Sequence, residues 1–269
     1  MRIILTLSTD RPLILPTHYN YGIQSLIYGA INDPALQSLV HDTGFIYEKR
    51  SFKMFTFSRL IGPVVHIGNR FQFTSPVTLH LSSPFDNLIQ EIAKYIFERG
   101  MVTLHGNELM VTDFQVEQPP AFGTDHTVRM LSPMVMYTTL ENERRKFRYY
   151  LNPWQDEFAE LIHNNLRKKF VSFYKREPVS SDFALKPLTE MRPELQKVIL
   201  YKGGVIKGWI GRYHVHGDPE MLRFAYDAGF GGKNSQGFGC FAVDDNPRPI
   251  DQVVGLTNAP ETGDDRESL

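Results

Sequence analysis

The chain has 269 residues, 42% of them hydrophobic and 22% charged, and its formal net charge at pH 7 is -1. This composition is that of an ordinary globular protein with room for one large domain or two small ones. No apolar run approaches the roughly 18 residues of a membrane span, and the single cysteine, Cys240, excludes an internal disulfide and a multi-cysteine zinc site. We therefore expect a cytoplasmic protein without a membrane partner.

In the first half of the chain, strand-like and helix-like hydrophobic patterns alternate. The first apolar stretch is too short for a signal peptide and ends at Asp10 and Arg11, so it predicts a strand. Asp33 and Pro34 begin a short helix that stops at Gly44. The expected elements are a strand over 2–8, helices over 20–31 and 34–43, a strand over 53–60, a hairpin of strands 64–67 and 70–74, a helix over 84–99 and two strands around residue 107.

The second half repeats this order of elements without a short sequence repeat. Its expected elements are a strand over 128–140, a helix over 154–174, strands over 197–201 and 206–214, a helix over 219–228 and a strand over 239–243. The order β, α, β, β, α, β predicts an α+β fold of tandem ferredoxin-like (RRM-like) domains, each an antiparallel sheet with helices on one face. We expect an N-terminal domain over 1–122, a C-terminal domain over 123–245 and an acidic disordered tail over 246–269.

Residues 229–239 read Gly-Phe-Gly-Gly-Lys-Asn-Ser-Gln-Gly-Phe-Gly, with five glycines in eleven positions. Glycines let a backbone approach a ligand closely, and turned N–H groups can cradle phosphates. Nucleotide-binding P-loops and dinucleotide fingerprints run from strand to helix, whereas this segment runs from helix to strand. A glycine-rich helix end with a purely structural role is the alternative. The candidate ligand-binding residues are Gly229, Gly231, Gly232, Lys233, Asn234, Ser235, Gly237 and Gly239.

Cations gather in the middle of the chain although the total charge is balanced, and their distribution matters more than the sum. Over 144–150 the sequence interleaves cations with one Phe and two Tyr, which suits phosphate contacts and base stacking. A solvated strand edge is the alternative. The candidate nucleic-acid-binding residues are Arg144, Arg145, Lys146 and Arg148, with Lys202, Lys207 and Arg212 as similar candidates further along.

The segment over 229–239 resembles the C-terminal glycine-rich signature of the repeat-associated RNA-binding superfamily. Within it the chain resembles the Cas-six family of CRISPR endoribonucleases, because residues 19–28, Tyr-Asn-Tyr-Gly-Ile-Gln-Ser-Leu-Ile-Tyr, are similar to that family's first helix. The order of elements is similar over about residues 1 to 245. The resemblance implies a tandem ferredoxin-like fold and cleavage of precursor guide RNA within its repeats.

The resemblance also implies a catalytic Tyr on the first helix, a His on the second and a Lys at the start of the next strand, which are Tyr28, His41 and Lys53 here. At about 100° per residue, Tyr28 and His41 both lie off the apolar faces of their helices, so a boundary tyrosine and a surface histidine are the alternatives. Metal-free RNA cleavage needs a base, an acid and a cation near the phosphorane. Histidine suits the acid–base work, and His18 is the second candidate for it.

We therefore expect a metal-independent endoribonuclease without a cofactor, whose products carry a 5′-hydroxyl and a 2′,3′-cyclic phosphate. The sequence contains no carboxylate pair or cysteine cluster for a metal, and His214 with His216 make too small a ligand set. The expected partners are precursor guide RNA and a CRISPR effector complex, with the chain as a monomer or homodimer. The alternative is a non-catalytic RNA-binding subunit of such a complex, against which Tyr28, His41 and Lys53 argue.

Overall fold

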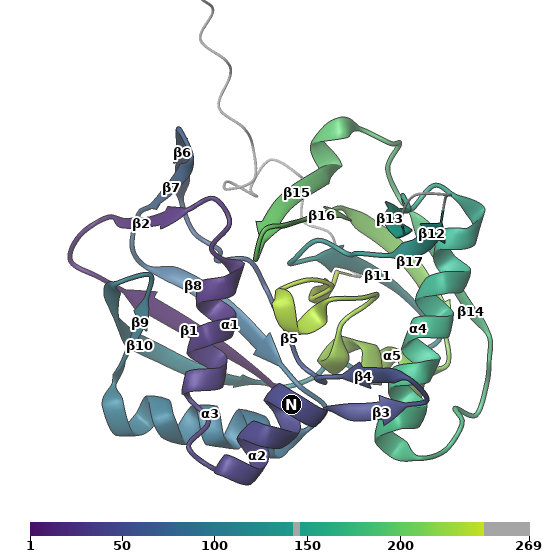
Figure 1. Ribbon diagram of the computed structural model, residues 1–269, viewed down its shortest axis with the longest axis horizontal. Helices are drawn as coiled ribbons and strands as arrows, with labels where there is room; N and C mark the ends of the chain where they lie inside the picture. The colour runs from purple at the N-terminus through teal and green to yellow at the C-terminus, as the bar shows by residue number, and fades with distance from the viewer. Residues whose placement is uncertain (142–145, 245–269) are drawn as a thin grey trace, which may run out of the picture.

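The computed structural model describes residues 1–141 and 146–244 of the chain. Figure 1 shows two halves side by side, the N-terminal one in purple and blue and the C-terminal one in green and yellow. Arg144, Arg145 and the expected tail over 246–269 lie outside the described residues. Among the helices of the described part, none combines the length and the apolar character that crossing a bilayer needs.

The N-terminal half is built on an antiparallel sheet with the strand order β5-β8-β1-β10-β9. Helices α1 and α3 pack on the face that carries Ile3, Leu5 and Leu7 of β1. The elements are β1 (Arg2–Ser8), β2 (Leu13–Pro16), α1 (Asn20–Gly29), α2 (Pro34–Ser38), the π-helical turn η1 (Leu39–Thr43), β3 (Phe45–Tyr47), β4 (Arg50–Phe52), β5 (Thr56–Phe57), β6 (Val64–Ile67), β7 (Arg70–Phe73), β8 (Val77–Ser82), α3 (Asp86–Arg99), β9 (Met101–Leu104) and β10 (Asn107–Glu117).

The C-terminal half is built on a second antiparallel sheet, with the order β14-β17-β11-β18 and with α4 and α5 on one face. Its elements are β11 (Asp125–Met130), β12 (Tyr137–Glu141), β13 (Lys146–Tyr150), α4 (Asp156–Tyr174), β14 (Phe183–Pro187), the 3-10 turn η2 (Pro193–Leu195), β15 (Gln196–Tyr201), β16 (Gly204–Trp209), β17 (Arg212–Gly217), α5 (Pro219–Ala228), the 3-10 turn η3 (Asn234–Gln236) and β18 (Phe241–Val243). In each half, when only the strands of the main sheet are counted, the second strand after the first helix (β8 or β17) lies beside the first strand (β1 or β11), which is the ferredoxin-like arrangement. The predicted tandem α+β fold is confirmed.

Three predicted strands are wrong in extent, each for a local reason. The strand expected over 53–60 shrinks to β5, because Met54 has a φ of 54° and turns the chain before it. The strand expected over 128–140 ends at Met130, because the next two N–H groups both donate to the Cys240 carbonyl and lead the chain out of the sheet. The strand expected over 206–214 breaks at Gly211, whose φ is 135°, so β16 and β17 join different sheets.

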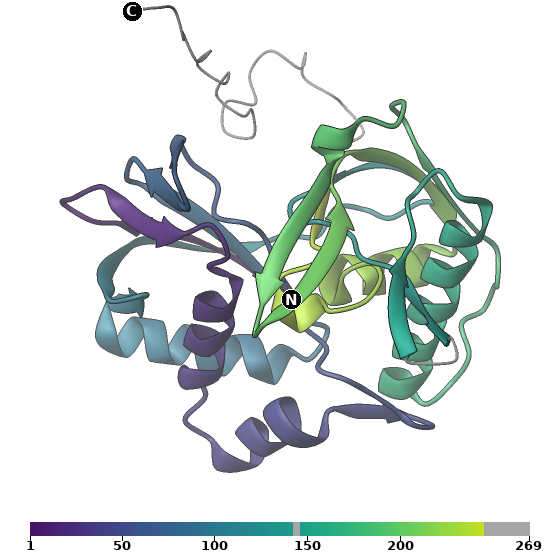
Figure 2. The same cartoon turned by 45° about the horizontal axis from the view of Figure 1, so that its top comes forward.

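Short hairpins extend from the two domains, and the predicted strands include those of β6–β7 and β15–β16 but not those of β3–β4. The sequence patterns missed β2, β3, β4 and β14, since strands of three to five residues show too little periodicity. The predicted hairpin β6–β7 is confirmed, and β2 joins it in a small sheet. Figure 2 shows β15 and β16 standing beside the N-terminal half, where the Leu200 N–H donates to His18 at 3.2 Å.

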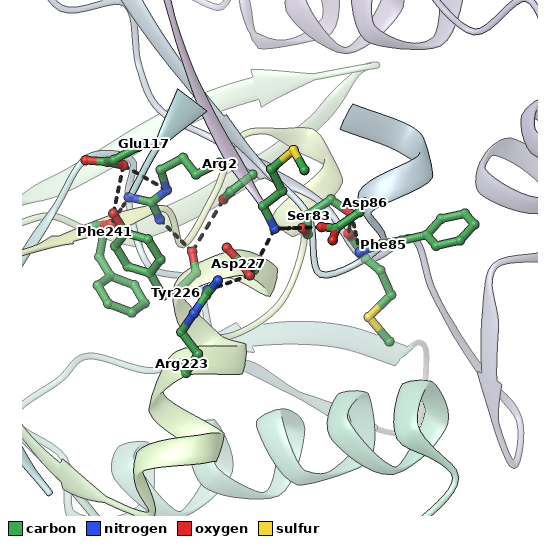
Figure 3. Close-up of polar contacts among 12 residues, drawn as sticks. Arg2, Ser83, Phe85, Asp86, Glu117, Arg223, Tyr226, Asp227 and Phe241 are labelled. Atoms are coloured by element: carbon green, nitrogen blue, oxygen red, sulfur yellow. Dashed lines mark hydrogen bonds and ion pairs between the residues drawn. The ribbon is translucent and has the colours of Figure 1, made fainter. Parts of the chain in front are cut away.

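Arg2 is a buried cation that joins the two halves (Figure 3). Its side chain is 1% exposed, and it donates to the Phe241 carbonyl at 2.8 Å and to the Tyr226 carbonyl at 2.5 Å. The guanidinium carbon lies 3.5 Å from the centroid of the Tyr226 ring, and Nε lies 3.6 Å from the Glu117 carboxylate. Because a buried charge is stable only when it is paired, these contacts tie β1 to α5 and β18.

We expect Arg2→Met to lower the free energy of unfolding by about 3 kcal/mol, because two buried carbonyls each lose a charged donor and Glu117 loses its cation. Methionine keeps an apolar stem of similar length, so the loss reports on the polar contacts. Denaturant unfolding followed by circular dichroism measures the change. The control Arg11→Met, at an exposed arginine, should stay within about 0.5 kcal/mol of wild type. A loss below about 1 kcal/mol for Arg2→Met would contradict this role.

Candidate active site

Tyr28 lies on α1 at the boundary between the N-terminal core and the solvent. Its half-buried ring meets the Phe55 ring edge-on at a centroid distance of 5.7 Å and the His41 imidazole at 4.7 Å. Burial raises the pKa of Tyr28 to about 12, although a hydrogen bond with the Ser235 side chain opposes the shift. The phenol is therefore neutral near pH 7 and keeps a proton that it can donate to a ligand oxygen.

His41 lies in the π-helical turn η1 that follows α2. The Gly44 N–H donates to the Leu39 carbonyl at 2.6 Å and closes this wide turn, a rare geometry that is frequent at functional sites. The turn leaves the His41 side chain 58% exposed and holds its Nδ1 2.7 Å from the Asp42 carboxylate. That carboxylate favours a proton on Nδ1, which leaves Nε2 to exchange a proton with a ligand.

Lys53 follows β4 and reaches back to the same turn. The close approach of β4 depends on Gly44, which has a φ of 69° and whose Cβ, if present, would lie 2.7 Å from the Phe52 carbonyl. Lys53 Nζ donates to the Asp42 carbonyl at 2.8 Å. Burial lowers the pKa of Lys53, and the nearby Asp42 carboxylate opposes that shift.

The structure thus places Tyr28, His41 and Lys53 around one turn, together with Asp42. The sequence singled out the first three but missed Asp42, although its position next to a candidate histidine was a signal. A phenol, an imidazole and an ammonium in one accessible place suit proton transfer at a phosphodiester and stabilisation of its developing charge.

The glycine-rich segment, which belongs to the C-terminal half, contacts this cluster through Ser235. Two amides of α1 hold it, because Gln24 Nε2 donates to the Ser235 carbonyl at 2.7 Å and Asn20 Nδ2 donates to the Gln236 carbonyl at 2.9 Å. The same segment carries Ser235 to the Tyr28 hydroxyl. One loop therefore connects the C-terminal domain to the helix that bears a candidate catalytic residue.

Lys169 of α4 holds the other side of the glycine-rich segment. Its side chain is 2% exposed, and Nζ donates to the Gly229 carbonyl at 2.5 Å, to the Gly231 carbonyl at 3.2 Å and to Asn234 Oδ1 at 3.1 Å. Burial lowers the pKa of Lys169 to about 7. This role was not predicted, although Lys169, three residues after Leu166, stands on the apolar stripe of its helix.

A cavity of about 430 Å³ lies beside the cluster and is called the α4 cavity below. Lys53 forms part of its wall, so the cavity and the candidate catalytic cluster adjoin. The glycine-rich segment forms another part, and Lys233 and Arg50 add positive charge to the lining. Such a lining suits a polyanion with a phosphate near Lys53.

Four of the five glycines in the segment are buried inside the chain. A Cβ at Gly231 would lie 2.4 Å from the Val135 carbonyl, and one at Gly237 would lie 2.4 Å from the Phe57 ring. Both have positive φ, as do Gly229 and Gly239. Packing, the alternative that the sequence left open, explains these four glycines, while contact between them and a ligand stays a prediction. Gly232 differs, because the atom nearest to its Cβ would be 3.8 Å away.

The described part of the basic stretch lies on β13, where Lys146 and Arg148 are exposed. The Arg148 guanidinium lies 5.5 Å from the centroid of the Tyr137 ring, and Lys233 Nζ lies 5.6 Å from the same centroid. Tyr137 therefore links the basic stretch to the glycine-rich segment. Contact between these cations and RNA stays a prediction.

Two other histidines considered from the sequence, His18 and His216, make their contacts outside the cluster. His18 lines a separate groove beside β6, β7 and β15. His216 lies between the carboxylates of Asp125 at 2.9 Å and Asp182 at 3.0 Å, an arrangement that holds strands together. In the described ranges, no group of three or more His, Cys, Asp or Glu side chains is placed to hold a metal ion.

Comparison with known proteins matches nearly the whole described chain to one family. Residues 14–115 match the family model "CRISPR-associated protein Cas6, N-terminal", and residues 116–243 match "CRISPR associated protein Cas6, C-terminal". The CRISPR-associated endoribonuclease Cas6 1 of Methanocaldococcus jannaschii is 29% identical over 246 residues, which cover 89% of this chain and 91% of that protein. The CRISPR-associated endoribonuclease Cas6 of Pyrococcus furiosus is 25% identical, with 88% and 86% covered. A solved structure described as CRISPR associated protein Cas6 has a TM-score of 0.74 at 28% identity, covering 90% of this chain and 98% of that one.

The adjacent glycines 231 and 232 provide a matched test of packing. We expect Gly231→Ala to lower the free energy of unfolding by at least about 2 kcal/mol, because it combines a left-handed backbone with a clash against a carbonyl. Gly232→Ala should change it by less than about 0.5 kcal/mol. Denaturant unfolding of both variants measures the difference. Equal stabilities would show that the backbone relaxes around a side chain at residue 231.

Proposed function

We infer that this chain, which belongs to the Cas6 family of CRISPR-associated proteins, is an endoribonuclease that cuts CRISPR precursor RNA within its repeats. The activity named for its relatives supports the RNA-cleaving function. The single observation that carries it is the cluster of Tyr28, His41 and Lys53 around the π-helical turn, next to a cationic cavity.

In the proposed reaction, the 2′-oxygen of a ribose attacks the neighbouring phosphorus while the bond to the 5′-oxygen of the next nucleotide breaks. One proton leaves the 2′-hydroxyl and one joins the departing 5′-oxygen, so the products carry a 2′,3′-cyclic phosphate and a 5′-hydroxyl. His41 Nε2 exchanges one of these protons. Asp42 is a positioning residue that orients the imidazole through Nδ1.

Lys53 and Tyr28 act on the charge that develops at phosphorus. The ammonium of Lys53 faces the same turn as His41, so it can stabilise the pentacoordinate phosphorane. Tyr28 keeps its proton at neutral pH and can donate it to a phosphate or ribose oxygen. Acid–base and electrostatic catalysis are thus supplied by side chains, and we infer that cleavage needs no metal ion and no cofactor.

Repeat RNA is the proposed partner, held by the exposed part of the basic stretch and by residues 232–235 of the glycine-rich segment. Delivery of the cut RNA to a CRISPR effector complex, and action as a monomer or a homodimer, are further parts of this proposal. A non-catalytic RNA-binding subunit would bind the same RNA and leave it intact, so the cleavage assays below separate the two functions.

Cleavage of repeat RNA should continue at an unchanged rate in excess EDTA, because His41 exchanges a proton and Lys53 supplies the cation without a metal ion. The 3′ ends of the upstream products should resist a ligase that requires a 3′-hydroxyl, until acid opens the cyclic phosphate and a phosphatase removes the remaining monophosphate. Gel analysis of end-labelled RNA measures both properties. Cleavage that stops in EDTA and returns with magnesium would contradict the metal-independent mechanism.

His41→Ala should reduce the single-turnover cleavage rate by about 10²- to 10⁴-fold, the usual contribution of a general acid or base. Saturating enzyme separates this chemical step from RNA binding, which should stay close to wild type. Lys53→Ala should also lose rate, since a cation near the phosphorane acts mainly on the transition state. Tyr28→Phe should lose less, because only one hydrogen bond is removed.

The matched control for that series is His66→Ala, at an exposed histidine on β6 that does not line the α4 cavity. It should cut at the wild-type rate. If His41→Ala also cuts at the wild-type rate, the catalytic assignment fails and His18 becomes the next residue to replace. A large loss of RNA affinity in His41→Ala would instead indicate a binding role.

A further inference from the structure

The face of α1 that carries Tyr28 also carries a glutamine whose two amide atoms are both hydrogen-bonded. Gln24 lies four residues before Tyr28 and is 7% exposed. Its Nε2 donates to the Ser235 carbonyl at 2.7 Å, and its Oε1 accepts from the Tyr201 hydroxyl. Since residues four apart are neighbours on one face of a helix, this amide lies next to the Tyr28 phenol.

Only one orientation of the Gln24 amide is compatible with both contacts. The Ser235 carbonyl can only accept a hydrogen bond, so it faces the amide nitrogen. The amide oxygen therefore faces Tyr201, whose hydroxyl has to donate. Burial raises the pKa of Tyr201, so this hydroxyl keeps its proton at neutral pH. Tyr201 thus determines which way the amide of Gln24 points.

Tyr201 belongs to the other half of the molecule, where it is the last residue of β15. The hairpin of β15 and β16 contacts α1 at this point, because the rings of Tyr201 and Tyr21 meet edge-on at a centroid distance of 6.0 Å. Lys202 Nζ lies 4.7 Å from the centroid of the same Tyr21 ring. Tyr201 is 9% exposed and belongs to a core cluster with Ile206 and Phe238. Its hydroxyl is therefore held in place by packing from both halves.

Ser235 connects Gln24 to Tyr28. Its carbonyl accepts from Gln24, and its side chain is hydrogen-bonded with the Tyr28 hydroxyl. A hydroxyl oxygen can accept one hydrogen bond while its own proton is donated elsewhere. When Ser235 donates to the Tyr28 oxygen, the Tyr28 proton is left for an oxygen of the RNA.

We propose, building on the endoribonuclease function above, that Gln24 is a positioning residue for RNA cleavage, which Tyr201 orients and which holds Ser235 against the Tyr28 hydroxyl. A contact from the β15–β16 hairpin then determines how well a residue of α1 meets the scissile phosphate. Without Gln24, the Ser235 carbonyl loses its donor, and the η3 turn can move away from α1. Gln24 is buried, so it changes the cleavage rate only through Tyr28.

The test is a double-mutant cycle on single-turnover cleavage with saturating enzyme. Gln24→Met keeps the length of the side chain and removes both of its hydrogen bonds. It should slow cleavage by about 5-fold, the rate equivalent of one hydrogen bond. In the Tyr28→Phe background it should change the rate by less than about 2-fold, because the hydroxyl that it positions is absent. An equal loss in both backgrounds, or no loss in either, overturns the proposal.

Two milder variants keep the test decisive if Gln24→Met folds poorly. Tyr201→Phe removes the hydroxyl and keeps the packing of the ring, and Ser235→Ala removes the side-chain bond to Tyr28. Each should slow cleavage by about 3-fold, and only when the Tyr28 hydroxyl is present. The matched control Gln90→Met, at an exposed glutamine on α3, should cut at the wild-type rate. Losses that persist in the Tyr28→Phe background contradict positioning through Tyr28.

A spectroscopic measurement separates this proposal from the function on which it rests. In protein with isotopically labelled tyrosine ring carbons, the NMR signal of Tyr28, assigned by its absence in Tyr28→Phe, reports on hydrogen bonding of the phenol. The signal should move in Gln24→Met and Ser235→Ala and stay in place in Gln90→Met. A signal that stays in place in Gln24→Met overturns the positioning role and leaves the endoribonuclease intact. If no repeat RNA is cut, the endoribonuclease function fails, and the signal still decides whether Gln24 positions Tyr28.

Discussion

The carbonyl oxygens of the glycine-rich segment need hydrogen-bond donors, and both halves of the molecule supply them from buried side chains. Lys169 donates from α4, while Asn20 and Gln24 donate from α1. A buried carbonyl without a partner is costly, so the segment holds its shape only when both halves are in place. That shape brings Ser235 to Tyr28 and builds one wall of the α4 cavity. The geometry of the candidate active site therefore depends on the contact between the two domains.

The parts of the fold that the sequence predicted have local causes. Asp33 caps its helix as expected, and Asp218 caps α5 in the same way, each accepting hydrogen bonds from two backbone N–H groups. Apolar periodicity predicted α3, α4 and α5, with an error of at most two residues at either end. The errors have tertiary causes. Residues 206–214 read as one strand, but the break at Gly211 depends on which sheet each part joins. No local pattern contains that information.

The candidate site was likewise predicted from the sequence only in part. Tyr28, His41 and Lys53 could be proposed from a resemblance and from their places off the apolar faces, but their convergence depends on a π-helical turn that no periodicity predicts. Lys169 was visible as a charge on an apolar stripe, yet its acceptor at Gly229 lies 60 residues away in the chain.

The π-helical turn has a consequence for how relatives of this chain are aligned. A turn closed between Leu39 and Gly44 holds one residue more than an α-helical turn. Each residue added to or removed from a helix rotates everything after it by about 100°. The direction of the histidine is thus encoded in the number of residues between the Asp33 cap and Gly44, and not only in their identity. An alignment that places a gap freely in this interval would pair His41 with residues that face elsewhere.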